Sequence, residues 1–261
     1  ELFNDEYAYE SSTTKDRRKN HDQLAKHVCE YFQLKENSLV VDIGSNVGVL
    51  LDCFKNLSMK VLGVDASPNI VKKANENGIN TISGFFDKEI VNKIISKHGK
   101  ASVITATNLF AHIQNYDEFL KNLKQLLSVK GIFVFQVPHF LKLVKNREYD
   151  TIYHEHFSYF GLKPLIKFFE EHQMELFDVI ETEIDGGSIR CFVSFKGKFT
   201  KTSNIEKILE KENNEKIYNI ERLEKFEKEV KQQKKDLNTM LKNLKNNGKK
   251  VVGVGAPAKG I

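Results

Sequence analysis

The sequence predicts an α/β protein with a mainly parallel β-sheet that is covered by helices on both faces. Strand-like and helix-like segments alternate between residues 38 and 137, and this alternation is typical of a parallel sheet. The first strand ends in a loop with two glycines, DIGSNVG. Later in the chain, two apolar segments flank Asp185-Gly186-Gly187 and predict an antiparallel hairpin at the end of the sheet.

Each element follows from its apolar period and its turn residues. Apolar residues at helical spacing predict a helix over 22–32, and the apolar run at 38–43 predicts the first buried strand. Ser67 and Pro68 suit the cap and the first position of a helix. The other expected elements, in chain order, are strand 60–64, helix 68–77, strand 80–83, helix 88–98, strand 101–106, helix 116–127, strand 131–137, helix 163–172 and the hairpin strands 176–183 and 188–195.

Residues 202–247 form a long amphipathic segment in which acidic and basic residues alternate on the outer face. This pattern favours a helical linker or helix pair that packs on a neighbouring domain or subunit over a membrane or calmodulin-binding helix. The next residues, KVVGVGAPAKG, predict a strand and a glycine turn. We therefore expect a domain over 1–200, a helical segment over 201–247 and the start of a second α/β domain over 248–261.

Composition excludes several classes of protein. The 261 residues can bury a full core, and 40% of them are hydrophobic without a long apolar run, so we expect no transmembrane helix. The net charge of +5 lies within 201–250, where 14 Lys or Arg face 9 Asp or Glu. The rest of the chain is neutral and predicts no nucleic-acid partner. Three widely spaced cysteines predict reduced core residues of a cytoplasmic protein.

The loop after the first strand has the features of a nucleotide-cofactor loop. Asp42 precedes it, Gly44 permits a tight turn, and Gly48 opens the next helix, whose backbone amides attract polar parts of a ligand. Asn46 stands where a dinucleotide-binding loop has its middle glycine, and Asn tolerates positive φ. A second acidic residue, Asp65, ends the next strand and can accept both ribose hydroxyls of an adenosine.

Together these residues resemble the S-adenosylmethionine site of class I methyltransferases, in which the acidic residue before the loop lies near the aminoacyl end of the cofactor. The dinucleotide pattern is not met, which disfavours a nicotinamide oxidoreductase. We therefore expect S-adenosylmethionine as the cofactor. The expected cofactor residues are Asp42, Gly44, Ser45, Asn46, Gly48, Asp65, Ala66, Gly84, Phe85, Phe86 and Asn108.

Two further clusters carry side chains suited to acid–base chemistry. Asn108 and His112 follow the fourth strand, and the carboxyl ends of parallel strands border the ligand crevice. Residues 149–156, YDTIYHEH, place a phenol, two imidazoles and a carboxylate close together. Metal binding through His154 and His156 is the competing interpretation. Because no third and fourth ligand can be named, we expect no metal site here.

Two anion-binding candidates lie in the hairpin and at the end of the chain. Arg190 either clamps a phosphate or carboxylate, or is a surface residue of the hairpin. The backbone amides of 253–260 and the side chain of Lys259 suit a phosphate, although a plain turn is equally compatible with this sequence.

The order of the motifs is more specific than any one of them. YESST, DIGSNVG, GVDAS, TNLFAHI, YDTIYHEHFSYF, GGSIR and GVGAPAKG resemble, along nearly the whole chain, the sugar C-methyltransferases that act on nucleotide-linked ketodeoxysugars. The resemblance implies a zinc-binding N-terminal domain, a central methyltransferase domain and a C-terminal α/β domain that helps to hold the nucleotide diphosphate. We therefore expect clustered cysteines before Glu1, with zinc only there, and a further α/β unit after Ile261.

The resemblance also implies a mechanism. A base removes a proton from the carbon next to the ketone, and the resulting enolate takes the methyl group. The implied base is His156, with Tyr153, Glu155 and His112 around the sugar, although the residues alone do not decide between His156 and His112 as the base. The other expected substrate contacts are Tyr7, Glu10, Arg190 and Lys259.

Two alternatives stay open at this stage. An O- or N-methyltransferase acting on a small molecule would share the cofactor loop without the enolate chemistry. A noncatalytic binding or scaffold module is suggested by the long charged helix, but Asp42, Asp65 and the YHEH motif argue against it. The sequence leaves the oligomeric state open between monomer and homodimer.

Overall fold

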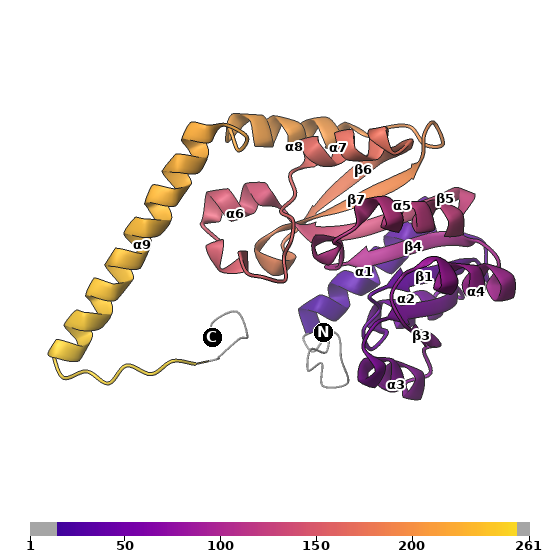
Figure 1. The fold of residues 1–261 in the computed structure, drawn as a ribbon, viewed down its shortest axis with the longest axis horizontal. Coiled ribbons are helices and arrows are strands. Elements are labelled where there is room, and N and C mark those ends of the chain that lie inside the picture. The colour runs from indigo at the N-terminus through magenta and orange to yellow at the C-terminus, as the bar shows by residue number, and fades with distance from the viewer. Residues whose placement is uncertain (1–14, 255–261) are drawn as a thin grey trace.

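The computed structural model describes residues 15–254, and these contain one seven-stranded sheet (Figure 1). The strand order is β3-β2-β1-β4-β5-β7-β6. The pairs from β3 to β5 are parallel, whereas β7 lies antiparallel between β5 and β6. The predicted fold class is therefore confirmed. The strands are β1 (Leu39–Ile43), β2 (Lys60–Asp65), β3 (Thr81–Ser83), β4 (Ala101–Thr107), β5 (Leu127–Pro138), β6 (Met174–Thr182) and β7 (Ser188–Phe195).

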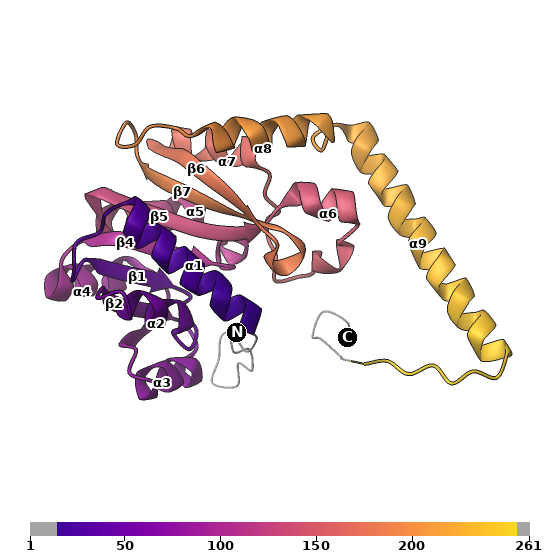
Figure 2. The same ribbon diagram turned by 180° about the vertical axis from the view of Figure 1, so that it is seen from behind.

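Helices cover both faces of the sheet, as Figures 1 and 2 show. One core cluster joins the sheet to α4 (Lys88–His98), α5 (Tyr116–Leu126) and α7 (Leu162–Glu171). A second cluster on the opposite face joins it to α1 (Lys15–Tyr31) and α2 (Val49–Lys55). Strands β1, β2, β4 and β5 contribute apolar residues to both clusters, which explains the continuous apolar runs in the sequence.

Local sequence sets several helix starts. Asp87 caps α4 by accepting a hydrogen bond from the backbone N–H of Ile90, which is the usual role of Asp at this position. Ser67 precedes α3 (Pro68–Glu76), with proline in the first turn. The side chain of Ser67 makes no capping hydrogen bond, so the predicted cap is only positional.

Three elements differ from the prediction. The first helix, α1, starts at Lys15 and not at residue 22, because its first two turns are polar and carry no apolar period. Strand β5 begins four residues early, at Leu127. Helix α6 (Phe140–Asn146) was not expected, since its apolar residues form no face of the main core and pack instead around Ile217.

The amphipathic segment is a pair of helices, α8 (Ser203–Asn214) and α9 (Ile220–Asn246). Ile205 and Ile208 of α8 are buried in the same core cluster as the sheet. By contrast, α9 buries none of its residues and extends away from the sheet (Figure 1). The expected strand after α9 is not formed over 250–254, and the rest of that motif lies outside the described residues. No helix in the described range has both the length and the hydropathy needed to cross a bilayer.

We predict that Gly48→Ala destabilises the protein more than Gly197→Ala. Both glycines have positive φ angles, 83° and 73°, so alanine strains both backbones by about 1–2 kcal/mol. Only at residue 48 would a Cβ atom also approach Ile79, 2.7 Å from its Cγ2, which adds an overpacking cost of about 1–3 kcal/mol. Urea unfolding of the two variants measures the difference. Equal losses of unfolding free energy would show that the side chain of Ile79 moves aside without cost.

Candidate active site

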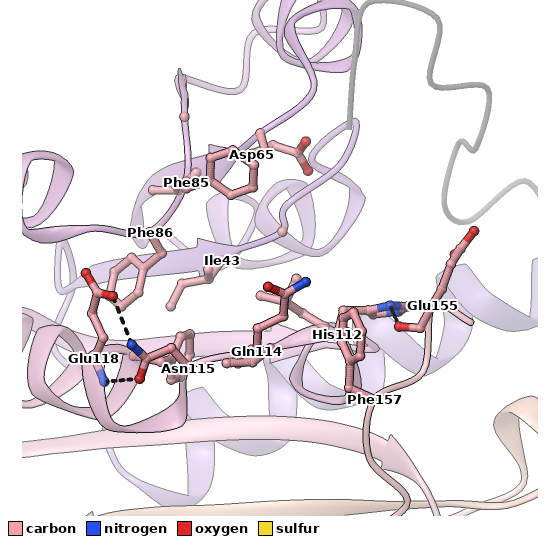
Figure 3. A pocket seen from close by; sticks show the side chains of 17 residues that line it. Ile43, Asp65, Phe85, Phe86, His112, Gln114, Asn115, Glu118, Glu155 and Phe157 are labelled. Atoms are coloured by element: carbon pink, nitrogen blue, oxygen red, sulfur yellow. Dashed lines mark hydrogen bonds between the residues drawn. The ribbon is translucent and has the colours of Figure 1, made fainter. Parts of the chain in front are cut away.

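A cavity of about 560 Å³ opens at the carboxyl ends of the parallel strands (Figure 3). Asp65, Phe85 and Phe86 line one end, and His112 and Glu155 line the other. The loops after β1, β2, β3 and β4 all contribute to its walls. One continuous space therefore joins part of the predicted cofactor site to two of the predicted acid–base residues, His112 and Glu155.

The carboxylate of Asp65 holds the two loops beside it together. Its Oδ2 accepts the backbone N–H of Asn46 at 2.9 Å, and its Oδ1 accepts the backbone N–H of Ser67 at 2.9 Å. Asn46 has a φ of 50°, the conformation that Asn adopts more easily than most residues. Burial raises the pKa of Asp65, while these amide donors oppose the shift. Each carboxylate oxygen has two lone pairs, so both keep acceptor capacity for a ligand.

Asp42 lies on the opposite face of β1 from the cavity residue Ile43. Its side chain is buried and accepts a 2.6 Å hydrogen bond from the hydroxyl of Thr105, its register partner on β4. Burial raises the pKa of Asp42 to about 7, and the nearby charge of Asp65 adds to the rise. Near neutral pH this carboxyl therefore changes charge easily.

The imidazole of His112, which lines the cavity, lies beside that of His156, which lines a small neighbouring pocket. Their imidazole centroids are 5.0 Å apart, in an edge-to-face arrangement. The Nδ1 of His112 bonds the carbonyl oxygen of Glu155 at 2.8 Å, and the Nδ1 of His156 bonds that of Thr151 at 2.8 Å. Because a carbonyl only accepts, both Nδ1 atoms carry the hydrogen and both Nε2 atoms are the basic positions of the neutral rings.

The two imidazoles differ in what surrounds them. His112 lines the cavity, and burial, with repulsion from His156, lowers the pKa of His112. The Nε2 of His156 lies 3.3 Å from the hydroxyl of Tyr153, which donates to it in this tautomer. His156 lines a small neighbouring pocket and not the main cavity. The side chain of His154 is 75% exposed, and its Nε2 lies 4.0 Å from a carboxylate oxygen of Glu155. Within 15–254 no three His, Cys, Asp or Glu side chains form a metal-binding group.

The hairpin turn contacts the loop after β4 and helix α1. Asp185 accepts a 2.8 Å hydrogen bond from the side-chain amide of Asn108 and forms an ion pair with Arg17 of α1. Asn108 and Asp185 have φ angles of 55° and 56°, which mark both as constrained positions. The amide of Asn108 is therefore turned toward the hairpin and α1.

Arg190 is not the surface residue that one interpretation of the hairpin predicted. Only 4% of it is exposed, and its guanidinium donates to Gln136 and Asn20, each at 3.1 Å. Burial lowers the pKa of Arg190 to about 10. Its Nε has no hydrogen-bond partner among the described residues. A neutral pair of side-chain amides thus holds a buried cation beneath α1.

The structure brings together only part of the predicted site. Gly44, Asp65, Ala66, Gly84, Phe85 and Phe86 line the cavity with His112 and Glu155, whereas Asp42, Ser45, Asn46, Gly48, Asn108, Tyr153, His156 and Arg190 lie outside its lining. Tyr7, Glu10 and Lys259 fall outside the described residues. The sequence analysis did not name Leu109, Ile113, Gln114, Asn115, Glu118, Phe119 and Phe157, which also line it. The signal for 109–115 was their place directly after β4.

The fold and the cavity define the class I methyltransferase architecture. Magnesium protoporphyrin IX methyltransferase from Synechocystis superposes with a TM-score of 0.54 at 13% identity, covering 72% of this chain and 90% of that one. A methyltransferase from Clostridium acetobutylicum gives a TM-score of 0.52 at 14% identity, covering 69% and 92%.

Sequence comparison places the chain more narrowly. Residues 16–179 match a family model described as a methyltransferase domain, and residues 183–261 match one described as a C-methyltransferase C-terminal domain. The chain is 33% identical over 232 residues to C-methyltransferase NovU of Streptomyces niveus, covering 88% of this chain and 55% of that protein. It is 27% identical over 137 residues to a sterol 4-C-methyltransferase of Caenorhabditis elegans, covering 51% and 39%. The chain therefore belongs to the methyltransferase-domain family, and its last part resembles the C-terminal domain of C-methyltransferases. It spans about half the length of NovU and less of the sterol methyltransferase.

We predict that Asp42→Asn stabilises the unliganded protein at pH 8 but not at pH 4. The pKa of Asp42 is raised from 3.8 to about 7 in the folded state, so folding favours the protonated carboxyl. Between these pKa values the wild type loses stability as the pH rises, whereas a neutral Asn does not. Thermal unfolding across pH 4–8 measures the gap, which should widen with pH. A gap that widens toward low pH would mean that the folded protein holds Asp42 ionised.

Proposed function

We propose that this chain is the catalytic part of an S-adenosylmethionine-dependent C-methyltransferase that methylates the carbon next to a ketone in a nucleotide-linked deoxysugar. The observation that carries the proposal is the single cavity lined by both Asp65 and the His112–Glu155 end. It is supported by the match of residues 183–261 to the C-methyltransferase C-terminal domain model and by the likeness to NovU.

The first part of the proposal concerns the cofactor. Asp65 would accept the ribose hydroxyls, and the apolar side chains of Phe86 and Ile113 would flank the adenine from walls that the cavity already has. Gly84 has a φ of 147° and leaves room for a close approach. The aminoacyl end would lie by the remaining predicted residues, Asp42, Ser45, Asn46, Gly48 and Asn108. When bound, S-adenosylmethionine supplies an electrophilic methyl group on a sulfonium.

The second part concerns the proton. A carbon beside a ketone becomes nucleophilic when a base takes its proton and a donor stabilises the enolate oxygen. We propose that His156 Nε2 is the base and that the Tyr153 hydroxyl moves from this nitrogen to the substrate oxygen. The imidazole nitrogen and the hydroxyl oxygen are 3.3 Å apart. This spacing would let one group act on the carbon next to the ketone while the other bonds the ketone oxygen. His112, neutral and facing the cavity, would lie between this pair and the methyl donor.

The remaining contacts concern the nucleotide diphosphate. Arg190 is proposed as an anion contact because its buried charge faces only neutral side chains in the described part of the chain. Tyr7, Glu10 and Lys259 are proposed with it on the resemblance alone. A second α/β domain after α9, and a zinc-binding domain at the N-terminal side, belong to the same proposal.

We predict that Asp65→Ala lowers the affinity for S-adenosylmethionine at least tenfold. The substitution removes charge-assisted hydrogen bonds of about 1.5–3 kcal/mol each. Calorimetry with S-adenosylmethionine, and with NAD for comparison, measures the change. Asp87→Ala is the control, because this aspartate only caps α4. Affinity equal to that of the wild type would remove the cofactor assignment.

We predict that the full-length protein exchanges the proton next to the ketone with D₂O without a methyl donor, and that His156→Asn does not. Turnover of the variant should fall about a hundredfold or more, the usual scale for a positioned base, while cofactor binding stays intact. NMR of a panel of nucleotide ketosugars follows the exchange, and mass spectrometry with the methyl donor identifies the product.

The exposed neighbour His154 gives the matched control, since His154→Asn leaves the hydrogen bonds of His156 in place. If His112→Asn alone abolishes exchange, the base is His112. If neither substitution matters, the enolate mechanism is wrong and an oxygen or nitrogen acceptor becomes the better proposal.

A further inference from the structure

A fully buried carboxylate, Glu212 of α8, binds both ends of the segment that carries the histidine cluster. Its Oε1 lies 2.7 Å from Nε2 of His139, the residue directly after β5. The same oxygen accepts the backbone N–H of Leu162, the first residue of α7, at 2.6 Å. Neither Glu212 nor His139 exposes any of its side chain. Residues 140–161 thus begin and end at one side chain.

The remaining partners of Glu212 complete a closed network. Its Oε2 accepts the hydroxyl of Tyr218 at 2.7 Å and the backbone N–H of Lys163 at 3.3 Å. A buried carboxylate is costly unless donors surround it, and here the amino end of α7 adds its favourable dipole. Burial acts to raise the pKa of Glu212, but the bonds from His139, Leu162 and Tyr218 outweigh it and lower the pKa.

The fit around Tyr218 is tight. A Cβ atom on Gly161 would lie 2.1 Å from the Tyr218 hydroxyl oxygen, so the phenol reaches Glu212 only because residue 161 has no side chain. The backbone closes the same gap, since the N–H of Phe140 donates to the carbonyl oxygen of Phe160 at 2.8 Å. Both backbone and side-chain hydrogen bonds therefore hold the two ends of residues 140–161 together.

The anchored ends of residues 140–161 are connected to the two imidazoles by a few hydrogen bonds. Within the segment, the carbonyl oxygen of Thr151 orients His156, and that of Glu155 orients His112. The N–H of Phe157 donates to the carbonyl oxygen of Ala111 at 3.0 Å, which ties the segment to the loop after β4. Asp65 bonds Asn46 and Ser67, outside this segment, so we expect a shift at Glu212 to act first on the imidazoles.

We propose that Glu212 is a positioning residue through which the C-terminal family region sets the geometry of the histidine segment. Glu212 and Tyr218 lie in the part matched by the C-methyltransferase C-terminal domain model, residues 183–261, whereas the segment lies in the part matched by the methyltransferase domain model, residues 16–179. Tyr218 lies in the link between α8 and α9, so its hydrogen bond to Glu212 also holds the chain just before α9. The expected effect of Glu212 on proton removal rests on the proposed function, but its role in holding the histidine segment in place does not.

The test compares Glu212→Gln with Glu210→Gln in the full-length protein. Glu210 lies on the same helix but is exposed. Gln keeps the shape of Glu212, but in either orientation its NH2 group faces a backbone N–H, that of Leu162 or that of Lys163, and one of the four hydrogen bonds is lost. With ¹⁵N-labelled histidine, we expect the Nε2 and Nδ1 signals of His156 and His112 to shift in Glu212→Gln and not in Glu210→Gln. The affinity for S-adenosylmethionine should stay within about twofold of the wild type.

A second readout measures chemistry. Exchange of the ketosugar proton at saturating substrate should slow at least tenfold in Glu212→Gln, with KM nearly unchanged. Tyr218→Phe removes one bond without changing the charge, so it should fold and show a smaller change in the same signals. Unchanged imidazole signals in both variants, or equal loss of cofactor binding and imidazole order, would overturn the proposal. If the wild type exchanges no proton of any ketosugar, but the imidazole signals still shift in Glu212→Gln, the proposed function fails and the positioning role stands.

Discussion

Parallel pairing of β1 with both β2 and β4 is the constraint on which the rest of the site depends. It brings the carboxyl ends of three strands to one edge, so that the loops after Ile43, Asp65 and Thr107 face each other. The price is strain where the chain leaves the sheet, seen in the positive φ angles of Asn46 and Asn108. The carboxylate of Asp65 offsets part of it by binding the Asn46 amide.

Three buried ionisable groups near this edge are accommodated in three different ways. Asp42 keeps a single side-chain donor, Thr105, and its pKa rises to about 7, so the group approaches neutrality. Glu212 collects four donors and its pKa falls. Arg190 meets two neutral amides. The number and kind of partners, more than depth, therefore decides the state of each charge. Of these three groups, Asp42 and Arg190 have only neutral hydrogen-bond partners among the described residues.

The sequence predicted what local pattern controls. Helix α4 begins and ends where its apolar period indicates, and Asp65 was recognised from its place at the end of a strand. It did not reveal α6, whose apolar side chains pack on Ile217 some seventy positions away along the chain. It also missed Glu212, which reads as one more charge on an amphipathic helix. Contacts of this kind depend on tertiary pairing that no local period encodes.

The boundary expected near residue 200 falls inside a continuous structure. Ile205 and Ile208 of α8 share the core cluster of the sheet, and Glu212 bonds residues on either side of the histidine segment. Removing the chain after β7 would therefore leave His139 and the amino end of α7 without their carboxylate, in addition to exposing apolar core. Helix α9 buries none of its residues, but at its start Leu223 and Phe226 pack against the cluster around Ile217, and Arg222 donates to the carbonyl oxygen of Val144. In this molecule the acid–base groups come from one family region, and the anchor that fixes their segment comes from the next.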